Sequence, residues 1–262
     1  MSELILYILL GCGTGMLAGM LGVGGGQIIV PGLIYVFYRQ GVSNDALMHV
    51  AIGTSLAAIV FTSLSAIYAH HRRGAVLWKV FARFTPGILV GALAGALCAD
   101  YLRSRELMIL FGTVLIVLAL QMLFEFSPKP SRQLPGGGAL AATGAGVGYL
   151  SALVGIGGGS MIVPFLVWCN RPLPGAVATA AACGLPVALA GALGFAVAGW
   201  GNAGLPAWSS GYIHWPACLG IVAASMLTAP LGARLAHSLP TRTLKRLFAV
   251  FLMVAGARIL AG

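Results

Sequence analysis

The chain has 262 residues, of which 59% are hydrophobic and 8% are charged, and its mean hydropathy is +0.97. A soluble domain carries about 25% charged residues, so this composition excludes a soluble globular protein and indicates an integral membrane protein. The net charge of +10 comes from basic residues in short loops, so we expect them to anchor the protein at an anionic lipid surface and expect no nucleic-acid partner.

Apolar runs of membrane length follow one another along the chain. In the first half they cover residues 4–22 with 27–38, 46–69, 80–101 and 106–126. In the second half they cover residues 138–155 with 160–169, 175–199, 214–236 and 243–261. The sequence therefore predicts an all-α integral membrane protein.

The two halves repeat one another. The segment Gly22-Val23-Gly24-Gly25-Gly26-Gln27-Ile28-Ile29-Val30-Pro31 returns as Gly155-Ile156-Gly157-Gly158-Gly159-Ser160-Met161-Ile162-Val163-Pro164, which indicates an internal duplication. The spacing between later matching residues changes, which places an insertion in the loop 202–212. We predict a first membrane repeat at 1–126, a proline-rich linker at 127–136 and a second membrane repeat at 137–262.

Each glycine cluster interrupts an apolar run and frees backbone groups that lipid cannot satisfy. Paired breaks of this kind in the two halves of a chain indicate a transporter's binding site. The run 27–38 would form a helix of about 18 Å, too short for a hydrocarbon core of about 30 Å. We therefore predict that each glycine segment is a hairpin that enters the membrane and returns; two full crossings are the alternative that the charges do not exclude.

The basic residues favour hairpins over single crossings, because positively charged loops collect on the cytoplasmic side. Hairpins place 11 of the 15 basic residues on one side, namely Arg72, Arg73, Lys79, Arg83, Lys129, Arg132, Arg171, Arg234, Arg242, Lys245 and Arg246. The 4 on the opposite side are Arg39, Arg103, Arg105 and Arg258. Single crossings would divide the same 15 residues into 7 and 8.

The hairpins determine the predicted topology. Each repeat is a glycine-broken helical hairpin plus three transmembrane helices. Because each repeat makes an odd number of crossings, the two repeats have inverted topology and both termini lie outside the cytoplasm.

The sequence contains no recognisable catalytic or metal-binding constellation. The five acidic residues lie at or near the ends of the apolar runs, which argues against a carboxylate-coupled pump. The five cysteines are scattered without C-x-x-C spacing, which favours reduced structural thiols. We therefore expect no enzymatic activity, no metal site and no cofactor.

Two further motifs accompany the glycine segments, Ala51-Ile52-Gly53-Thr54-Ser55-Leu56 and Pro230-Leu231-Gly232-Ala233-Arg234-Leu235. Together these motifs resemble the sulfite exporter TauE/SafE family. The resemblance implies a multi-pass permease of the bacterial cell inner (plasma) membrane that exports a small sulfur-containing anion such as sulfite or an organosulfonate. A passive anion channel, or an uptake permease for a related small organic anion, is the alternative. The partners are then the anion and the lipid bilayer, and a homo-oligomer is left open.

A helix that restarts after a glycine break presents free N–H groups and a partial positive charge, which suit an oxyanion. We predict that the substrate-binding residues are Gly24, Gly25, Gly26, Gln27, Thr54, Ser55, Gly157, Gly158, Gly159 and Ser160. The alternatives are that the glycines only allow close helix packing and that the hydroxyls bond to their own backbone.

Three further expectations concern single residues. His49 is a candidate proton-linked group or, alternatively, an interface histidine. Gly95 and Gly232 are expected to be packing glycines. Ala181 and Ala182 match Thr54 and Ser55, so the second half lacks these hydroxyls and any site is asymmetric.

Overall fold

The structure is a computed structural model that describes residues 2–21, 25–124, 132–202, 204–236 and 241–261. The helices of the first half are α1 (Ser2–Leu21), α2 (Gly26–Arg39), α3 (Asn44–Arg72), α4 (Trp78–Ala99) and α5 (Ser104–Leu123). The second half contains α6 (Gly137–Val154), α7 (Gly159–Trp168), α8 (Leu173–Ala198), strands β1 (Ser209–Ser210) and β2 (Ile213–His214), α9 (Trp215–Ala236) and α10 (Thr241–Ala261). The helices follow the predicted apolar runs, because a helix satisfies its backbone groups internally where lipid offers no partner.

Seven of the described helices are long and apolar enough to cross a membrane: α1, α3, α4, α5, α6, α8 and α9. The protein is therefore an all-α, multi-pass membrane protein, as predicted. α7 has 10 residues and is about 15 Å long, so it cannot cross a hydrocarbon core of about 30 Å. α2 has 14 residues and is about 21 Å long. The two helices that follow the glycine segments are thus the short ones.

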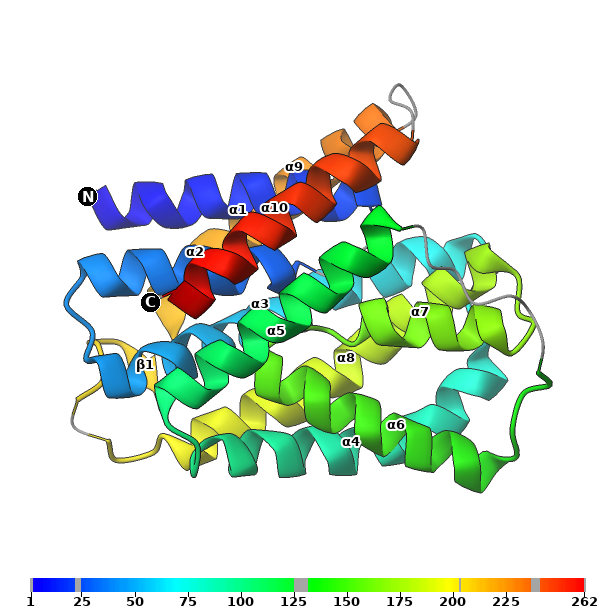
Figure 1. Ribbon diagram of the computed structural model, residues 1–262, viewed down its shortest axis with the longest axis horizontal. Helices are drawn as coiled ribbons and strands as arrows, with labels where there is room; N and C mark the ends of the chain where they lie inside the picture. Colours follow the sequence, from blue (N-terminus) through cyan, green and yellow to red (C-terminus); the bar gives the residue numbers. More distant parts are fainter. Residues whose placement is uncertain (1, 22–24, 125–131, 203, 237–240, 262) are drawn as a thin grey trace.

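The helices run roughly side by side, and the chain reverses at two opposite ends of the molecule (Figure 1). One end holds both termini, the α2–α3 and α4–α5 connections and the β-hairpin. The other end holds the α3–α4 and α7–α8 connections and the start of α6. The pairs α1 with α2 and α6 with α7 double back, as both the predicted hairpins and the alternative of two full crossings require.

Helices of the two halves pack in matched pairs. α1 lies along α9, and its counterpart α6 lies along α4, the counterpart of α9. α3 packs on its own counterpart α8, and α5 packs on α10. Two repeats related by a twofold axis would pack in this way. The repeat boundaries and the inverted sense of the repeats stay predictions.

Glycines permit the closest of these helix contacts. A Cβ placed on Gly95 of α4 would lie 2.5 Å from the carbonyl oxygen of Tyr149 on α6. A Cβ on Gly232 of α9 would overlap the carbonyl oxygen of Met16 on α1. Both are therefore packing glycines, as predicted, because close backbone approach is a main source of attraction between helices in lipid.

We expect Gly95→Leu to lower the melting temperature of the detergent-purified protein, since forcing a side chain against the α6 backbone costs about 1–3 kcal/mol. The matched control is Gly146→Leu on α6, where a Cβ would have no atom within 4 Å. Equal melting temperatures for the two variants would contradict the packing role of Gly95.

The charge distribution predicts the orientation. We expect Tyr101→Cys, a position 88% exposed at the end that holds the termini, to react with an impermeant thiol reagent added to intact cells. Arg73→Cys, at the opposite end, should react only after the cells are permeabilised. The wild-type protein gives the background from its native cysteines, and the reverse pattern would overturn the orientation.

Candidate functional site

The second glycine segment separates α6 from α7. α6 ends at Val154, and Gly155 follows it with a left-handed backbone of φ 68°. Gly158 precedes α7 with φ 72°, which is also left-handed. Side chains rarely tolerate such angles, so glycines let the chain reverse over residues 155–158.

The two glycine segments meet inside the molecule. A Cβ on Gly26, at the start of α2, would overlap the carbonyl oxygen of Gly155 and lie 3.1 Å from the Cα of Ile156. Gly25 caps α2 and is buried, whereas the predicted site residue Gly24 lies outside the described residues. The fold therefore brings the predicted residue Gly26 of the first half against the break of the second half.

The predicted hydroxyls of α3 hold neighbouring elements in place. Ser55 Oγ donates a hydrogen bond of 3.0 Å to the carbonyl oxygen of Gly155. Thr54 Oγ1 accepts the backbone N–H of His214 at 3.0 Å. Both side chains are fully buried. Each hydroxyl thus bonds across to another element, whereas the alternative expectation was a bond within its own helix.

Four buried polar side-chain atoms beside the breaks have no hydrogen-bond partner among the described residues: Thr14 Oγ1, Gln27 Oε1, Ser151 Oγ and Ser160 Oγ. Most buried polar groups in proteins are paired, and an unpaired one costs about 1–3 kcal/mol. Gln27 and Ser160, in the first turns of α2 and α7, are two of the predicted substrate-binding residues. The Ser160 hydroxyl can donate to a ligand, whereas the unpaired Gln27 atom is the amide oxygen, which accepts, and Gln27 donates only through Nε2.

Thr14 and Ser151 were not predicted from the sequence. A Cβ on Gly25 would lie 2.6 Å from the methyl group of Thr14, and one on Gly158 would lie 3.3 Å from Ser151 Oγ. Nothing in the sequence separates them from hydroxyls such as Thr179, which bonds to a carbonyl of its own helix at 2.7 Å. Only their position beside the glycines distinguishes them.

Backbone donors add to this set at the start of α7. The N–H groups of Met161 and Ile162 donate to Gly158 O at 3.1 and 3.0 Å. Within the described part of the chain, the N–H groups of Gly159 and Ser160 have no backbone acceptor. First-turn N–H groups have no acceptor within their own helix, and the helix start carries a partial positive charge. The start of α7 therefore suits an anion.

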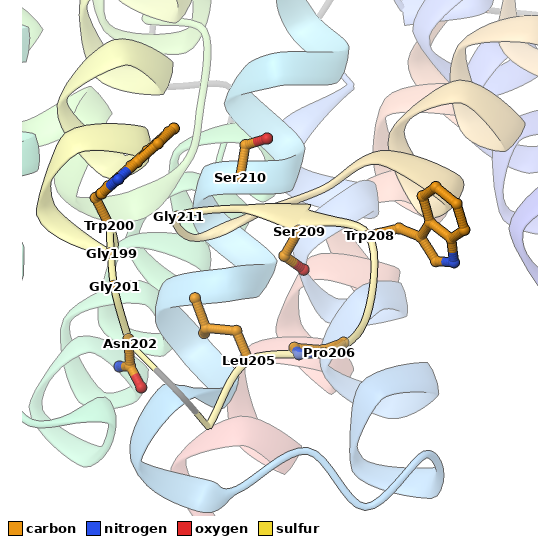
Figure 2. Close-up of a pocket in the computed structure, with 10 residues that line it drawn as sticks. All are labelled: Gly199, Trp200, Gly201, Asn202, Leu205, Pro206, Trp208, Ser209, Ser210 and Gly211. Carbon is orange, nitrogen blue, oxygen red and sulfur yellow. The ribbon is translucent and has the colours of Figure 1, made fainter.

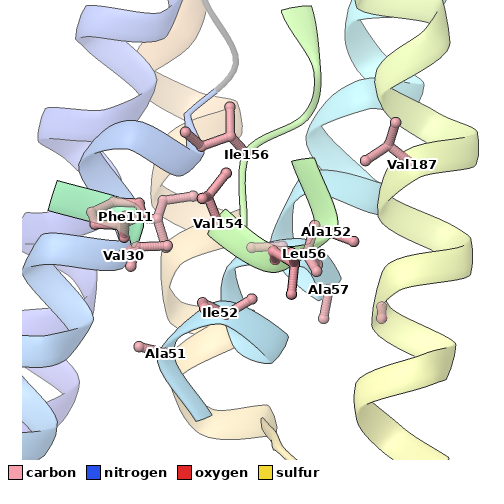
Figure 3. Packing of buried hydrophobic residues seen from close by; sticks show 14 of the residues in the cluster. Val30, Ala51, Ile52, Leu56, Ala57, Phe111, Ala152, Val154, Ile156 and Val187 are labelled. Carbon is pink, nitrogen blue, oxygen red and sulfur yellow. The ribbon is translucent and has the colours of Figure 1, made fainter. Parts of the chain in front are cut away.

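Apolar side chains from several helices surround the second break (Figure 3). Figure 3 shows Val30 of α2, Ile52 and Leu56 of α3 and Val187 of α8 near Ile156. No Lys, Arg, Asp or Glu side chain is buried among the described residues. The polar groups of the breaks are therefore neutral and lie in apolar surroundings, where hydrogen bonds are strong.

Ser160 also borders a groove between α5 and α7. Its volume is about 310 Å³, and it is lined by Thr113, Val114, Val117, Leu118, Gln121, Ser160, Met161 and Pro164. The break is therefore close to the surface of the molecule on this side.

The β-hairpin covers α3 at the end that holds the termini. A Cβ on Gly53 would lie 2.5 Å from the carbonyl oxygen of Tyr212, beside the bond from His214 to Thr54. The Tyr212 hydroxyl donates to Asp100 Oδ1 at 2.9 Å, which ties the hairpin to the end of α4. Figure 2 shows the preceding loop around a hollow of about 260 Å³. This loop contains the insertion predicted at 202–212.

His49 lies apart from the breaks, near the first turn of α3. Its Nε2 faces the carbonyl oxygen of Ala99 at 2.9 Å, and its Nδ1 faces that of Asp45 at 3.2 Å. Its ring lies against that of Tyr212, with 5.0 Å between centroids. His49 therefore joins α3 to the end of α4 and to the hairpin, and its proton-linked role stays a prediction.

Comparison with known proteins shows that the chain is similar to membrane transporters. The model of the family described as sulfite exporter TauE/SafE matches residues 7–259. A probable membrane transporter protein of Haemophilus influenzae is 36% identical over 96% of each chain. The probable membrane transporter protein YunE of Bacillus subtilis is 26% identical over 98% of this chain and 97% of its own length. The probable membrane transporter protein MJ0441 of Methanocaldococcus jannaschii is 27% identical over 96% of this chain and 93% of its own length. No solved structure matches the chain.

We expect Ser55→Ala to lower the melting temperature, because it leaves the buried Gly155 carbonyl without its donor at a cost of about 1–3 kcal/mol. Thr143→Ala is the control, since that hydroxyl bonds only to Ala139 O of its own helix. A melting temperature unchanged in Ser55→Ala would show that this hydrogen bond does not support the second break.

Proposed function

The chain belongs to the sulfite exporter TauE/SafE family, and we propose that this membrane transporter is a permease for a small sulfur-containing anion such as sulfite or an organosulfonate. We propose further that it exports the anion across the bacterial inner membrane. The observation that carries the proposal is the set of free polar groups where the two glycine segments meet.

These groups suit a sulfur oxyanion. Such an anion has several acceptor oxygens on one atom. The start of α7 offers the Ser160 hydroxyl and two N–H groups that have no backbone acceptor among the described residues. Gln27, buried in the other half, could donate through its amide Nε2. A helix start stabilises negative charge without burying a cationic side chain in the membrane.

The proposed direction of transport follows from the membrane potential. Because the cell interior is negative, the potential drives anions outward by about 2.3 kcal/mol per charge at 100 mV. An anion that accumulates inside the cell can then leave without a coupled cation.

The hairpin cover favours a carrier over a passive channel. Tyr212 and His214 contact Gly53 and Thr54, so the hairpin covers α3 at this end. We interpret this cover as part of a carrier, because a permanently open pore needs an unobstructed end. In proteoliposomes a carrier should show saturable, slow anion efflux, and unsaturable flux at channel rates would instead favour the passive channel.

Alanine substitutions that remove the unpaired polar groups test whether these groups bind the anion. We expect Gln27→Ala and Ser160→Ala to weaken sulfite or sulfonate binding about tenfold or more, since each removes a hydrogen bond to a charged ligand. Each variant should keep or raise the melting temperature of the ligand-free protein, because it removes a buried polar atom that has no partner. Calorimetric titration and thermal melting of purified protein measure the two effects.

Ser55→Ala is the matched control, because it removes a hydroxyl that is paired and should lower the melting temperature. Normal affinity in well-folded Gln27→Ala and Ser160→Ala proteins would place the anion elsewhere. The glycines would then serve packing alone.

A further inference from the structure

We propose that the site where the glycine breaks meet selects singly charged oxyanions, a sulfonate or the hydrogen form of sulfite, and that Ser151 is one of its donors. This inference rests on the proposed function and names the charge of the anion and a residue that neither the family nor the sequence motifs assign.

The donors around the breaks are all neutral. The buried polar side chains there include Thr14, Gln27, Ser55, Ser63 and Ser151, and no lysine or arginine is buried among the described residues. A Cβ on Gly184 would lie 3.2 Å both from Ser63 Oγ and from the carbonyl oxygen of Gly157. An anion at the breaks is therefore held by N–H and O–H groups and by the helix start.

The two buried histidines do not supply a positive charge to this site. The Nδ1 of His214 accepts the backbone N–H of Ala217 at 3.3 Å, so this nitrogen carries no proton and the ring is neutral. Burial also lowers the pKa of His214. His49 lies away from the breaks: its Nε2 is 2.9 Å from the carbonyl oxygen of Ala99, and its Nδ1 is 3.4 Å from the Ser104 hydroxyl.

The charge of the anion decides whether neutral donors can compensate for the hydration that it loses on binding. The cost of moving an ion out of water grows with the square of its charge, whereas the attraction between the ion and a neutral donor grows only in proportion to that charge. Neutral donors and one partial helix charge therefore compensate a monoanion much better than a dianion. Hydroxyl and amide oxygens also accept hydrogen bonds, so they can pair with the proton that hydrogen sulfite retains.

Ser151 lies where its hydroxyl can donate a hydrogen bond to the anion. It is fully buried in the last turn of α6, and its Oγ lies 3.3 Å from the position of a Cβ on Gly158, the residue that caps α7. Its hydroxyl has no partner among the described residues, whereas the buried Ser225 hydroxyl bonds to Val222 O at 3.1 Å in its own helix. A Cβ on Gly159 would have no atom within 4 Å, which leaves room for the organic group of a sulfonate.

Calorimetry on the purified protein tests the charge preference with three anions. Methanesulfonate stays a monoanion and should bind equally well between about pH 6 and pH 8, which also controls for titration of the protein. Sulfate is a dianion over this range and should bind at least about tenfold more weakly. Total sulfite should bind less tightly as pH rises, approaching about tenfold per pH unit once the hydrogen form is the minor species.

Sulfate binding as tight as methanesulfonate, or sulfite binding that strengthens as pH rises, would overturn the charge preference alone. If none of the three anions binds, the proposed function fails together with this inference.

The role of Ser151 has its own test. Ser151→Ala should weaken methanesulfonate binding about tenfold and keep or raise the melting temperature. Ser225→Ala, which removes a paired hydroxyl, should leave the affinity unchanged. Unchanged affinity in Ser151→Ala would remove this residue from the site.

Discussion

The structure depends on one constraint: a broken helix in a membrane exposes backbone groups that lipid cannot satisfy. The chain meets this constraint by burying each break against the other, with Gly26 touching Gly155 and Ile156. The short helices α2 and α7 begin at these breaks, and α2 is buried over much of its length, whereas α7 buries only Ile162 and Leu166. The longer helices pack in matched pairs, α1 with α9 and α4 with α6, where small residues allow close contact.

Burying the breaks does not satisfy every polar group near them. Ser55 and Thr54 use their hydroxyls to hold Gly155 and the β-hairpin. Among the residues that the structure describes, Gln27 Oε1, the Ser160 hydroxyl and two further hydroxyls have no partner, at a cost to stability that a ligand could recover. The division between paired and unpaired groups separates the side chains that hold the breaks from those that face the proposed anion.

The two halves are duplicated but perform different tasks. Only the first half has the Thr54–Ser55 pair, and its Ser55 supports the break of the second half. Only the second half has the insertion that precedes the β-hairpin, which closes one end of the bundle over Gly53. Such asymmetry gives the two ends of the molecule different surroundings although the helices repeat. One end is covered by a hairpin, and the other carries the basic turn with Arg72 and Arg73.

The sequence by itself determined the helices, the family and the part of the chain that contains the proposed site. Apolar runs of membrane length form helices in lipid, and a repeated glycine segment marks where they break, so these features follow from local composition. The sequence also proposed Gln27 and Ser160, because they begin the helices after the breaks. It did not identify Thr14 or Ser151, nor the bonds of Thr54 and Ser55 to other elements. Whether a buried hydroxyl is paired depends on which distant backbone group lies beside it, and only the packing of the helices decides that.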